Sequence, residues 1–322
     1  MISYIFRKLL LSIPLILGVI TLIFILVQLS PGDATDRFFT PETPPEVRQM
    51  VMEKWGLDQP VHIQYLRMIG NLSTGDFGTS IAQERPVFDI IGEKLPNTLL
   101  LSGVTLSIII FTGVSLGIAQ AIRQYSIFDN LASVISLFFY SMPSFWLALM
   151  LILIFSLHLE LLPASGMVDA VSHDFMSPSQ KFWDRVRHLI LPGVGLGVAS
   201  SAGMARYMRS SMLEVIRQDY VRTARAKGLS ETTVVLKHSV RNALLPIITL
   251  VGLSLPFLFS GSVLIEYVFA WPGMGRVIVE AIFTQDTPLI IACFFVFTIL
   301  VVTGNLLADI AYSMVDPRIR LG

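Results

Sequence analysis

The chain has 322 residues, of which 53% are hydrophobic and only 14% are charged. In soluble globular proteins about a quarter of all residues are charged, so this composition indicates a protein that lies in lipid. The formal net charge of zero gives no reason to expect nucleic acid as a partner, and Cys293, the single cysteine, excludes an intrachain disulfide.

Six apolar segments are expected to cross the membrane. A hydrocarbon core of ~30 Å needs roughly 20 residues of helix. Five charge-free runs are long enough: 9–29, 98–122, 131–157, 243–265 and 288–308. A sixth run, 189–205, is shorter and rich in small residues, and it can borrow the apolar stems of Arg206 and Arg209. We therefore predict an all-α polytopic membrane protein with six transmembrane helices.

The charges between these runs predict the orientation of the chain. Thirteen Lys and Arg residues fall on the side of the two termini, and ten fall on the opposite side. Six of those ten lie in the long segment 30–97, where the positive-inside rule has little force. Both termini are therefore expected in the cytoplasm. Residues 1–29 are expected to be a retained anchor, because their apolar run is longer than the apolar region of a signal peptide and no A-x-A cleavage site follows it.

The first 97 residues are predicted to form an N-terminal part, with an anchor over 9–29 and a large external loop over 30–97. Within this loop we expect a helix over Pro45–Trp55, because proline is favoured in the first turn. Residues 98–322 are predicted to form a five-helix core, and they include a polar loop over 206–242.

The stretch from Gly113 to Gly117 reads Gly-Val-Ser-Leu-Gly and allows two interpretations. As G-x-S-x-G it would be a nucleophile elbow centred on Ser115, which requires a strand-turn-helix context. As G-x-x-x-G it is a surface on which another membrane helix packs closely. The position in the middle of a predicted helix favours close packing.

Two further features leave alternatives open. Pro143, deep in a predicted span, indicates either a simple kink or a wall of a translocation path. The segment 158–188 carries His158, His173 and His188, which suggest a metal site. Their spacing matches no ligand pattern, so ordinary polar residues are the favoured interpretation, with nickel handling kept open.

The polar loop carries eight Lys or Arg residues against three acidic ones over 205–242. Asp219 is expected to cap a two-turn helix over Tyr220–Lys227, and Gly228 is a natural stop for it. Tyr220, Ala224 and Lys227 share one face by spacing. The small residues of this helix would let a partner approach the backbone, with basic residues around the edge. We predict that this helix contacts a cytoplasmic partner through nine residues: Asp219, Tyr220, Arg222, Thr223, Ala224, Arg225, Ala226, Lys227 and Gly228.

Asp309 lies near the predicted inner membrane face. Ionisable groups at that depth usually find a partner of opposite charge. Our hypothesis pairs Asp309 with Arg206 or Arg209.

Several motifs resemble the permease subunits of binding-protein-dependent ABC importers, specifically the B-type subunit of the dipeptide/oligopeptide/nickel class. The resemblance covers nearly the whole chain. It includes Ser30-Pro31-Gly32-Asp33, Gly75-Asp76-Phe77-Gly78-Thr79-Ser80, Trp271-Pro272-Gly273-Met274-Gly275-Arg276, Asp286-Thr287-Pro288 and Asp316-Pro317-Arg318. Such permeases carry a cytoplasmic motif in which Glu-Ala-Ala precedes a glycine and a proline follows. Here Arg222-Thr223-Ala224, Gly228 and Pro246 take those places. Arginine replaces the glutamate, and Gly228 lies 18 residues before Pro246, which is longer than in sugar-type permeases. Both departures are usual for the peptide class.

The resemblance implies a type I ABC importer permease fold in the bacterial inner membrane, with the helix over Tyr220–Lys227 docked on an ATPase. It implies as partners a second homologous permease subunit, two ATP-binding subunits and an extracytoplasmic substrate-binding protein. Peptides are the expected cargo, with nickel, glutathione or another small solute as alternatives. ATP and magnesium would be bound by the partner ATPases, and no cofactor, metal or catalytic residue is expected on this chain.

The residues themselves also weigh against two other classes. The sequence contains no G-x-x-x-x-G-K-[ST], so this chain has no P-loop and must borrow an ATPase. A membrane enzyme using Ser115 and a histidine is disfavoured, since all five histidines lie in predicted loops. A secondary transporter would normally carry a coupling acid inside the membrane, and the six predicted spans contain no Asp or Glu. Substrate-binding residues remain unassigned.

Overall fold

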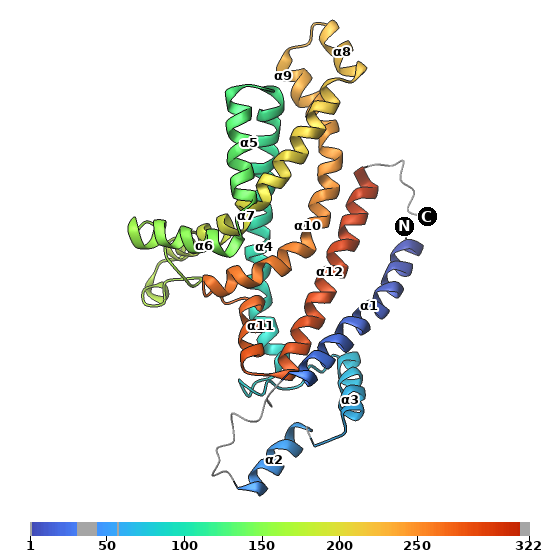
Figure 1. Ribbon diagram of the computed structural model, residues 1–322, viewed down its shortest axis with the longest axis vertical. Helices are drawn as coiled ribbons and strands as arrows, with labels where there is room; N and C mark the ends of the chain where they lie inside the picture. Colours follow the sequence, from blue (N-terminus) through green and yellow to red (C-terminus); the bar gives the residue numbers. More distant parts are fainter. Residues whose placement is uncertain (1, 31–43, 57, 316–322) are drawn as a thin grey trace. The chain divides into compact units, whose positions relative to one another are not determined.

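The computed structural model describes residues 2–30, 44–56 and 58–315 (Figure 1). Among these residues there is no strand, only a single isolated bridge between Thr79 and Pro86. The all-α prediction is therefore confirmed. The longer helices are α1 (Ile2–Leu29), α4 (Val87–Ile122), α5 (Ile127–Tyr140), α7 (Pro178–Ile216), α10 (Arg241–Val268) and α12 (Thr287–Val315).

Shorter helices connect them. They are α2 (Pro45–Trp55), α3 (Val61–Thr74), α6 (Ser144–Leu151), η2 (Ile152–His158), η3 (His173–Phe175), α8 (Asp219–Ala226), α9 (Glu231–Thr233), η4 (Val234–Val240) and α11 (Met274–Phe283). The helix α2 has the predicted bounds, with Pro45 in its first turn and Gly56 ending it in the left-handed conformation.

Five helices of the described residues are long and apolar enough to cross a membrane, and a bent pair makes a sixth if it counts as one span. The five lie within 4–29, 87–122, 178–216, 231–252 and 287–310. Each overlaps a predicted run. The helices extend beyond the runs because polar residues at their ends continue the helical hydrogen bonding.

The bent pair occupies the predicted span 131–157. Helix α5 ends at Tyr140, α6 begins at Ser144, and the axis turns by 103° between them. Pro143 precedes the first residue of α6, and its ring disfavours helical backbone at Met142. The kink is confirmed, and it is a break. The role of this site as a wall of a path stays a prediction.

The described chain forms two compact units. Unit 1 contains Thr98–Pro272 and the described chain from Thr303 onward, and unit 2 contains Ile2–Asn97 and Gly273–Val302. The two units are defined by contacts within the chain. The predicted division into an N-terminal part, 1–97, and a five-helix core, 98–322, stays a prediction.

Helix α7 lies at the centre of unit 1 and packs against α5, α6 and α10. It also meets α4 at Gly113 and Gly117. A Cβ at Gly113 would lie 2.7 Å from Met204 Cβ, and a Cβ at Gly117 would lie 2.5 Å from the Ala205 carbonyl oxygen. This contact confirms close helix packing as the meaning of G-x-x-x-G. Ser115 lies within α4, between the two packing glycines, and not at a strand-to-helix turn.

In unit 2, the Asp286 carboxylate holds a loop against the start of α12. It accepts hydrogen bonds from Ser80 Oγ at 2.5 Å and from the backbone N–H groups of Ile81 and Ala82 at 3.2 and 2.9 Å. It also accepts from the Leu289 N–H at 3.3 Å, which satisfies the first turn of α12. Asp286 is fully buried. Two of the family-like motifs therefore meet through one carboxylate.

Candidate functional site

Helix α8 lies at one end of unit 1, beyond the end of α7 (upper part of Figure 1). It starts one residue before the predicted start. Gln218 is the N-cap residue, no side chain caps the helix, and Asp219 is its first helical residue. The prediction that Asp219 caps α8 was therefore wrong, although an acidic residue in the first turn still stabilises a helix through its dipole.

Gly228 ends α8 as predicted. The Leu229 N–H donates to the Ala224 carbonyl at 3.4 Å, and the Gly228 N–H donates to the Arg225 carbonyl at 2.9 Å. This pair of bonds is a Schellman motif, which places its glycine in the left-handed region. Gly228 has φ +75°, and a Cβ there would meet no atom within 4 Å. Glycine is favoured at this position by the backbone conformation alone.

One face of α8 is buried within the chain. Val221 and Ala224 pack with Val234 of η4 and with Val215 at the end of α7. Val221 is fully buried and Ala224 is 5% exposed. The prediction that Ala224 offers a small outward surface was wrong, because its side chain faces η4. Tyr220 and Lys227, which the spacing placed on the same face as Ala224, are exposed, so the three residues do not form one surface.

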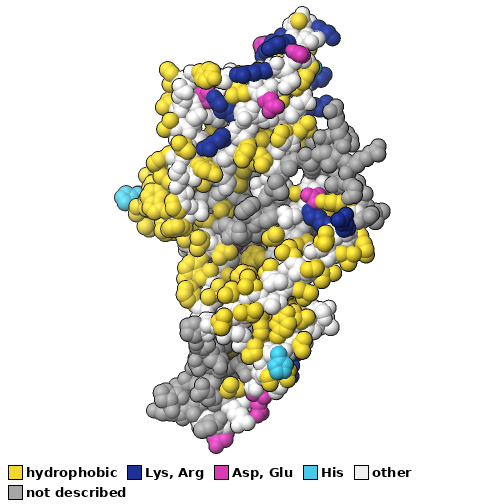
Figure 2. All heavy atoms as spheres, turned by 45° about the vertical axis from the view of Figure 1, so that its right-hand side comes forward, with side chains coloured by type: hydrophobic (Ala, Val, Ile, Leu, Met, Phe, Trp, Pro, Cys, Tyr) yellow, Lys and Arg dark blue, Asp and Glu magenta, His cyan; other side chains and the backbone are white. Residues whose placement is uncertain are grey.

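The opposite face of α8 is exposed and basic. Its exposed residues are Asp219, Tyr220, Arg222, Thr223, Arg225, Ala226 and Lys227. Figure 2 shows Lys and Arg side chains gathered at this end of unit 1. Arg225 makes a paired contact with Glu231 of α9, at 2.8 and 3.3 Å, so it also fastens α8 to α9. Helix α8 is therefore fixed to its neighbours in two ways, by its buried apolar face and by this ion pair.

Arg209 pairs with a carboxylate that the sequence reasoning missed. Its Nε and Nη2 donate to Asp129 Oδ1 and Oδ2 at 2.8 and 2.7 Å. The guanidinium of Arg206 lies over the Tyr140 ring, 5.4 Å from its centroid. Both arginines therefore have partners other than Asp309 in the structure, and their pairing with Asp309 stays a hypothesis. Asp129 lies just outside the predicted run 131–157, in the first turn of α5, and 80 residues separate it from Arg209.

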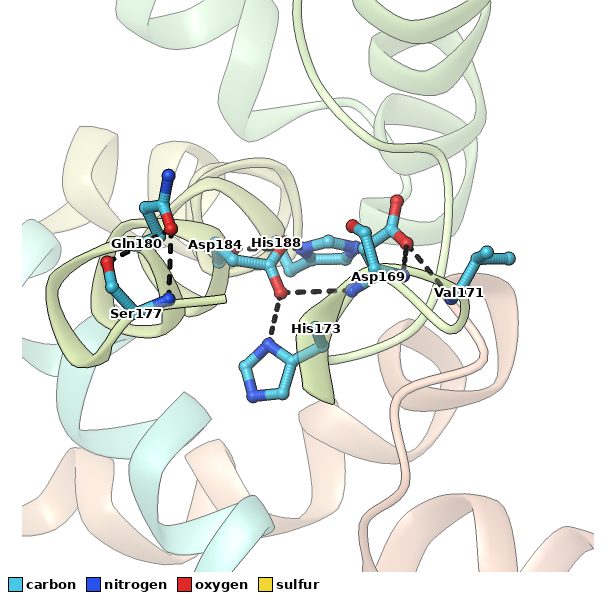
Figure 3. A network of polar contacts seen from close by, with 8 residues as sticks. Asp169, Val171, His173, Ser177, Gln180, Asp184 and His188 are labelled. Atoms are coloured by element: carbon cyan, nitrogen blue, oxygen red, sulfur yellow. Dashed lines mark hydrogen bonds and ion pairs between the residues drawn. The ribbon is translucent and has the colours of Figure 1, made fainter. Parts of the chain in front are cut away.

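Two of the three histidines that suggested a metal form a hydrogen-bonded network with Asp184 (Figure 3). The Asp184 carboxylate contacts His173 Nδ1 at 2.6 Å and His188 Nδ1 at 3.2 Å, and it accepts the Asp169 N–H at 3.0 Å. All three side chains are buried. Within the described part of the chain, no group of three or more potential ligands could hold a metal ion.

Asp169 extends the same network. The backbone N–H groups of Ser172 and Val171 donate to its carboxylate at 2.7 and 2.9 Å, and these bonds hold the pKa of Asp169 below its ordinary value. The network therefore fastens the segment between η2 and α7 to the first turns of α7, which is a structural role.

The sequence matches two families along its length. Residues 113–321 match the family described as "Binding-protein-dependent transport system inner membrane component". Residues 1–102 match the N-terminal part of such membrane components. The chain belongs to this family of transport-system inner membrane components.

Curated relatives agree along the full length of the chain. It is 43% identical to an oligopeptide transport system permease protein, AppB, of Bacillus subtilis, over 99% of this chain and 100% of the relative. It is 39% identical to a glutathione transport system permease protein, GsiC, of Salmonella paratyphi A, over 99% of both chains. It is also 39% identical to a dipeptide transport system permease protein, DppB, of Alkalihalophilus pseudofirmus, over 99% of this chain and 100% of the relative.

Solved structures share the fold. A chain of the MetNI methionine ABC transporter in an inward-facing conformation aligns with a TM-score of 0.57 at 17% identity, over 71% of this chain and 97% of that chain. A chain of an amino acid ABC transporter aligns with a TM-score of 0.51 at 13% identity, over 70% of this chain and 94% of that chain. At these identities the likeness shows the fold alone, and this fold is the permease fold of an ABC importer.

Proposed function

We propose that this chain is the membrane-spanning permease subunit of an ATP-driven importer for peptides. The family, the full-length relatives and the apolar helices support a subunit that forms a transport path. The observation that carries the proposal furthest is α8, a short exposed helix whose inner face is fixed to η4 by Val221 and Ala224.

Energy enters such a subunit through contact with another protein. The chain has no P-loop, so ATP is bound and hydrolysed by separate subunits. The outer face of α8 docks on an ATPase in the cytoplasm, and closure of the ATPases on ATP favours one of two pore conformations. Because Val221 of α8 packs in one cluster with Val215 at the end of α7 and Val234 at the start of η4, a displacement of α8 is transmitted to both helices.

The remaining partners follow from the same assignment. A second, homologous permease subunit completes the path, two ATP-binding subunits bind on the cytoplasmic side, and an extracytoplasmic binding protein delivers the cargo. The complex lies in the bacterial inner membrane with both termini of this chain in the cytoplasm. This chain itself has no catalytic residue and binds no cofactor.

Dipeptides and oligopeptides are the proposed cargo, because relatives named for each stand at about 40% identity over the whole chain. Glutathione, itself a tripeptide, is the second candidate, since a relative named for it is equally similar. Nickel, an alternative that the sequence left open, has no comparable support.

The test is uptake into vesicles that contain the purified complex together with its binding protein. We expect ATP-dependent accumulation of a labelled dipeptide or oligopeptide that a tenfold excess of unlabelled peptide suppresses. Accumulation of glutathione alone would replace peptides by the second candidate. A chain that purifies without any ATP-binding subunit and still transports would contradict the proposal.

A further inference from the structure

Unit 1 contains a cavity of about 400 Å³ between helices α4, α6, α7 and α10. This volume lies within the range of small-molecule sites, which is about 300–1,000 Å³. Ser144, Ser200, Ser254 and Tyr207 bring four hydroxyl groups to its lining from three different helices. No charged side chain lines it among the described residues.

Helix α7 presents one continuous stripe to this cavity. Leu196, Ser200, Gly203 and Tyr207 recur at helical spacing and all line it. The other side of α7 packs on Gly113 and Gly117 of α4. Of the five long apolar helices described, α7 is the least apolar and the most buried. A helix with this composition is poorly suited to face lipid, because lipid itself offers hydroxyl groups no hydrogen-bond partner.

The hydroxyl groups keep capacity for a ligand. Ser254 Oγ donates to the Leu250 carbonyl at 2.7 Å and Ser200 Oγ to the Leu196 carbonyl at 3.4 Å, which leaves acceptor lone pairs on both. Ser144 makes no side-chain hydrogen bond within the described part of the chain. It is the first residue of α6, directly after the break at Pro143, and no side chain caps that helix.

We propose that this cavity is the part of the peptide path that the chain itself supplies, and that its hydroxyl groups contact the backbone amides of the passing peptide. The inference rests on the proposed function. Every residue of a peptide other than proline carries an N–H and a C=O that need partners inside the membrane. Serine and tyrosine hydroxyls can donate to or accept from these groups, and an uncharged lining accepts peptide side chains of either sign.

The break at Pro143 places Ser144 at this cavity. By ending α5 and turning α6 through 103°, it brings the start of a helix to the cavity wall. A continuous helix would have placed closed backbone hydrogen bonds at that position.

Cysteine substitution tests the proposal directly. Ser144→Cys, Ser200→Cys and Ser254→Cys each exchange one atom. The native Cys293 is fully buried, so the background of labelling on this chain is low. Ser107→Cys is the matched control, because Ser107 is an exposed serine of α4 that also bonds to a carbonyl four residues before it and does not line the cavity.

The purified complex is placed in lipid nanodiscs and treated with a charged methanethiosulfonate reagent, and labelling is read on this chain after separation of the subunits. We expect the three cavity cysteines to react at least about tenfold faster than the Ser107→Cys control, because a thiolate forms in a water-accessible path and is suppressed in lipid. Modification should abolish ATP-driven peptide uptake in vesicles, and a reducing agent should restore it.

Labelling rates equal to the control, or complete modification that leaves uptake unchanged, would overturn the inference and leave the proposed function intact. Absence of ATP-driven peptide uptake by the unmodified wild-type complex would instead remove the proposed function.

Discussion

At the scale of single residues, Gly228 separates backbone geometry from docking. Its left-handed φ favours glycine, but asparagine and aspartate also adopt this region at modest cost, and the space around the position is open. The two side chains have the same size and differ in charge, so Gly228→Asn is a matched control for Gly228→Asp.

We predict that Gly228→Asp lowers peptide uptake at least tenfold, which corresponds to about 1.4 kcal/mol. The carboxylate repels the carbonyl groups at the end of α8 and reduces the positive charge of the docking face. Gly228→Asn should keep uptake within about twofold of wild type, because asparagine tolerates the same backbone conformation and adds no charge. Equal uptake by the two variants in vesicles would show that charge at position 228 does not affect transport.

The ion pair between Asp129 and Arg209 belongs to the same scale. Asp129 is 1% exposed, and removal of one partner from a buried pair costs roughly 3–5 kcal/mol. The side chain of Arg209 is 27% exposed, so we expect a cost near the lower end of that range for Asp129→Asn.

The corresponding measurement is a double-mutant cycle on the thermal stability of the purified complex. Arg209→Gln and the double variant complete the cycle. The double variant should lose less stability than the sum of the two single variants, because the unpaired charge is gone. Additive losses would show that the two residues are not coupled.

At this scale, features set by local chemistry could be predicted from the sequence, and contacts between distant residues could not. The polar loop, its helix and the stop at Gly228 were predictable, because helix ends have local chemistry. The burial of Ala224 was not, since it depends on Val234 in another element. The partner of Arg209 was out of reach for the same reason, because 80 residues separate the two side chains.

At the scale of elements, the contact between α4 and α7 depends on the absence of side chains. We predict that Gly117→Ala destabilises the complex, because the added methyl group would lie 2.5 Å from the Ala205 carbonyl oxygen. A methyl group added at Gly103, in the same helix, would meet no atom within 4 Å. Gly103→Ala should therefore leave stability unchanged or raise it slightly through helix propensity.

Thermal unfolding of the two variants in the assembled complex checks this expectation. A Gly117→Ala complex as stable as the Gly103→Ala complex would mean that the two helices can move apart without cost. The G-x-x-x-G pattern predicted close packing, but the identity of the partner helix came only from the fold.

The bent pair α5 and α6 shows a second limit at this scale. Hydropathy treated 131–157 as one span, because average apolarity does not respond to a change of direction. Proline at position 143 predicted a disturbance of the helix. Its size, 103°, depends on how α6 packs against α7, which no local pattern contains.

At the scale of the whole molecule, composition, the apolar runs and the family-like motifs were sufficient to predict a polytopic ABC importer permease. The fold and family agree with that prediction. The cavity could not be predicted, because its four helices meet only in the folded chain. The role of α8 is the central claim, since it determines how energy from another subunit reaches this one.

Site-specific photo-crosslinking from α8 tests this claim most directly. A photoreactive residue at the exposed Thr223 is compared with one at Phe175, which is 91% exposed in the segment between η2 and α7. In a complex that takes up peptide, we predict that Thr223 captures an ATP-binding subunit and that Phe175 does not. Failure of Thr223 to capture any ATP-binding subunit in such a complex would contradict the account.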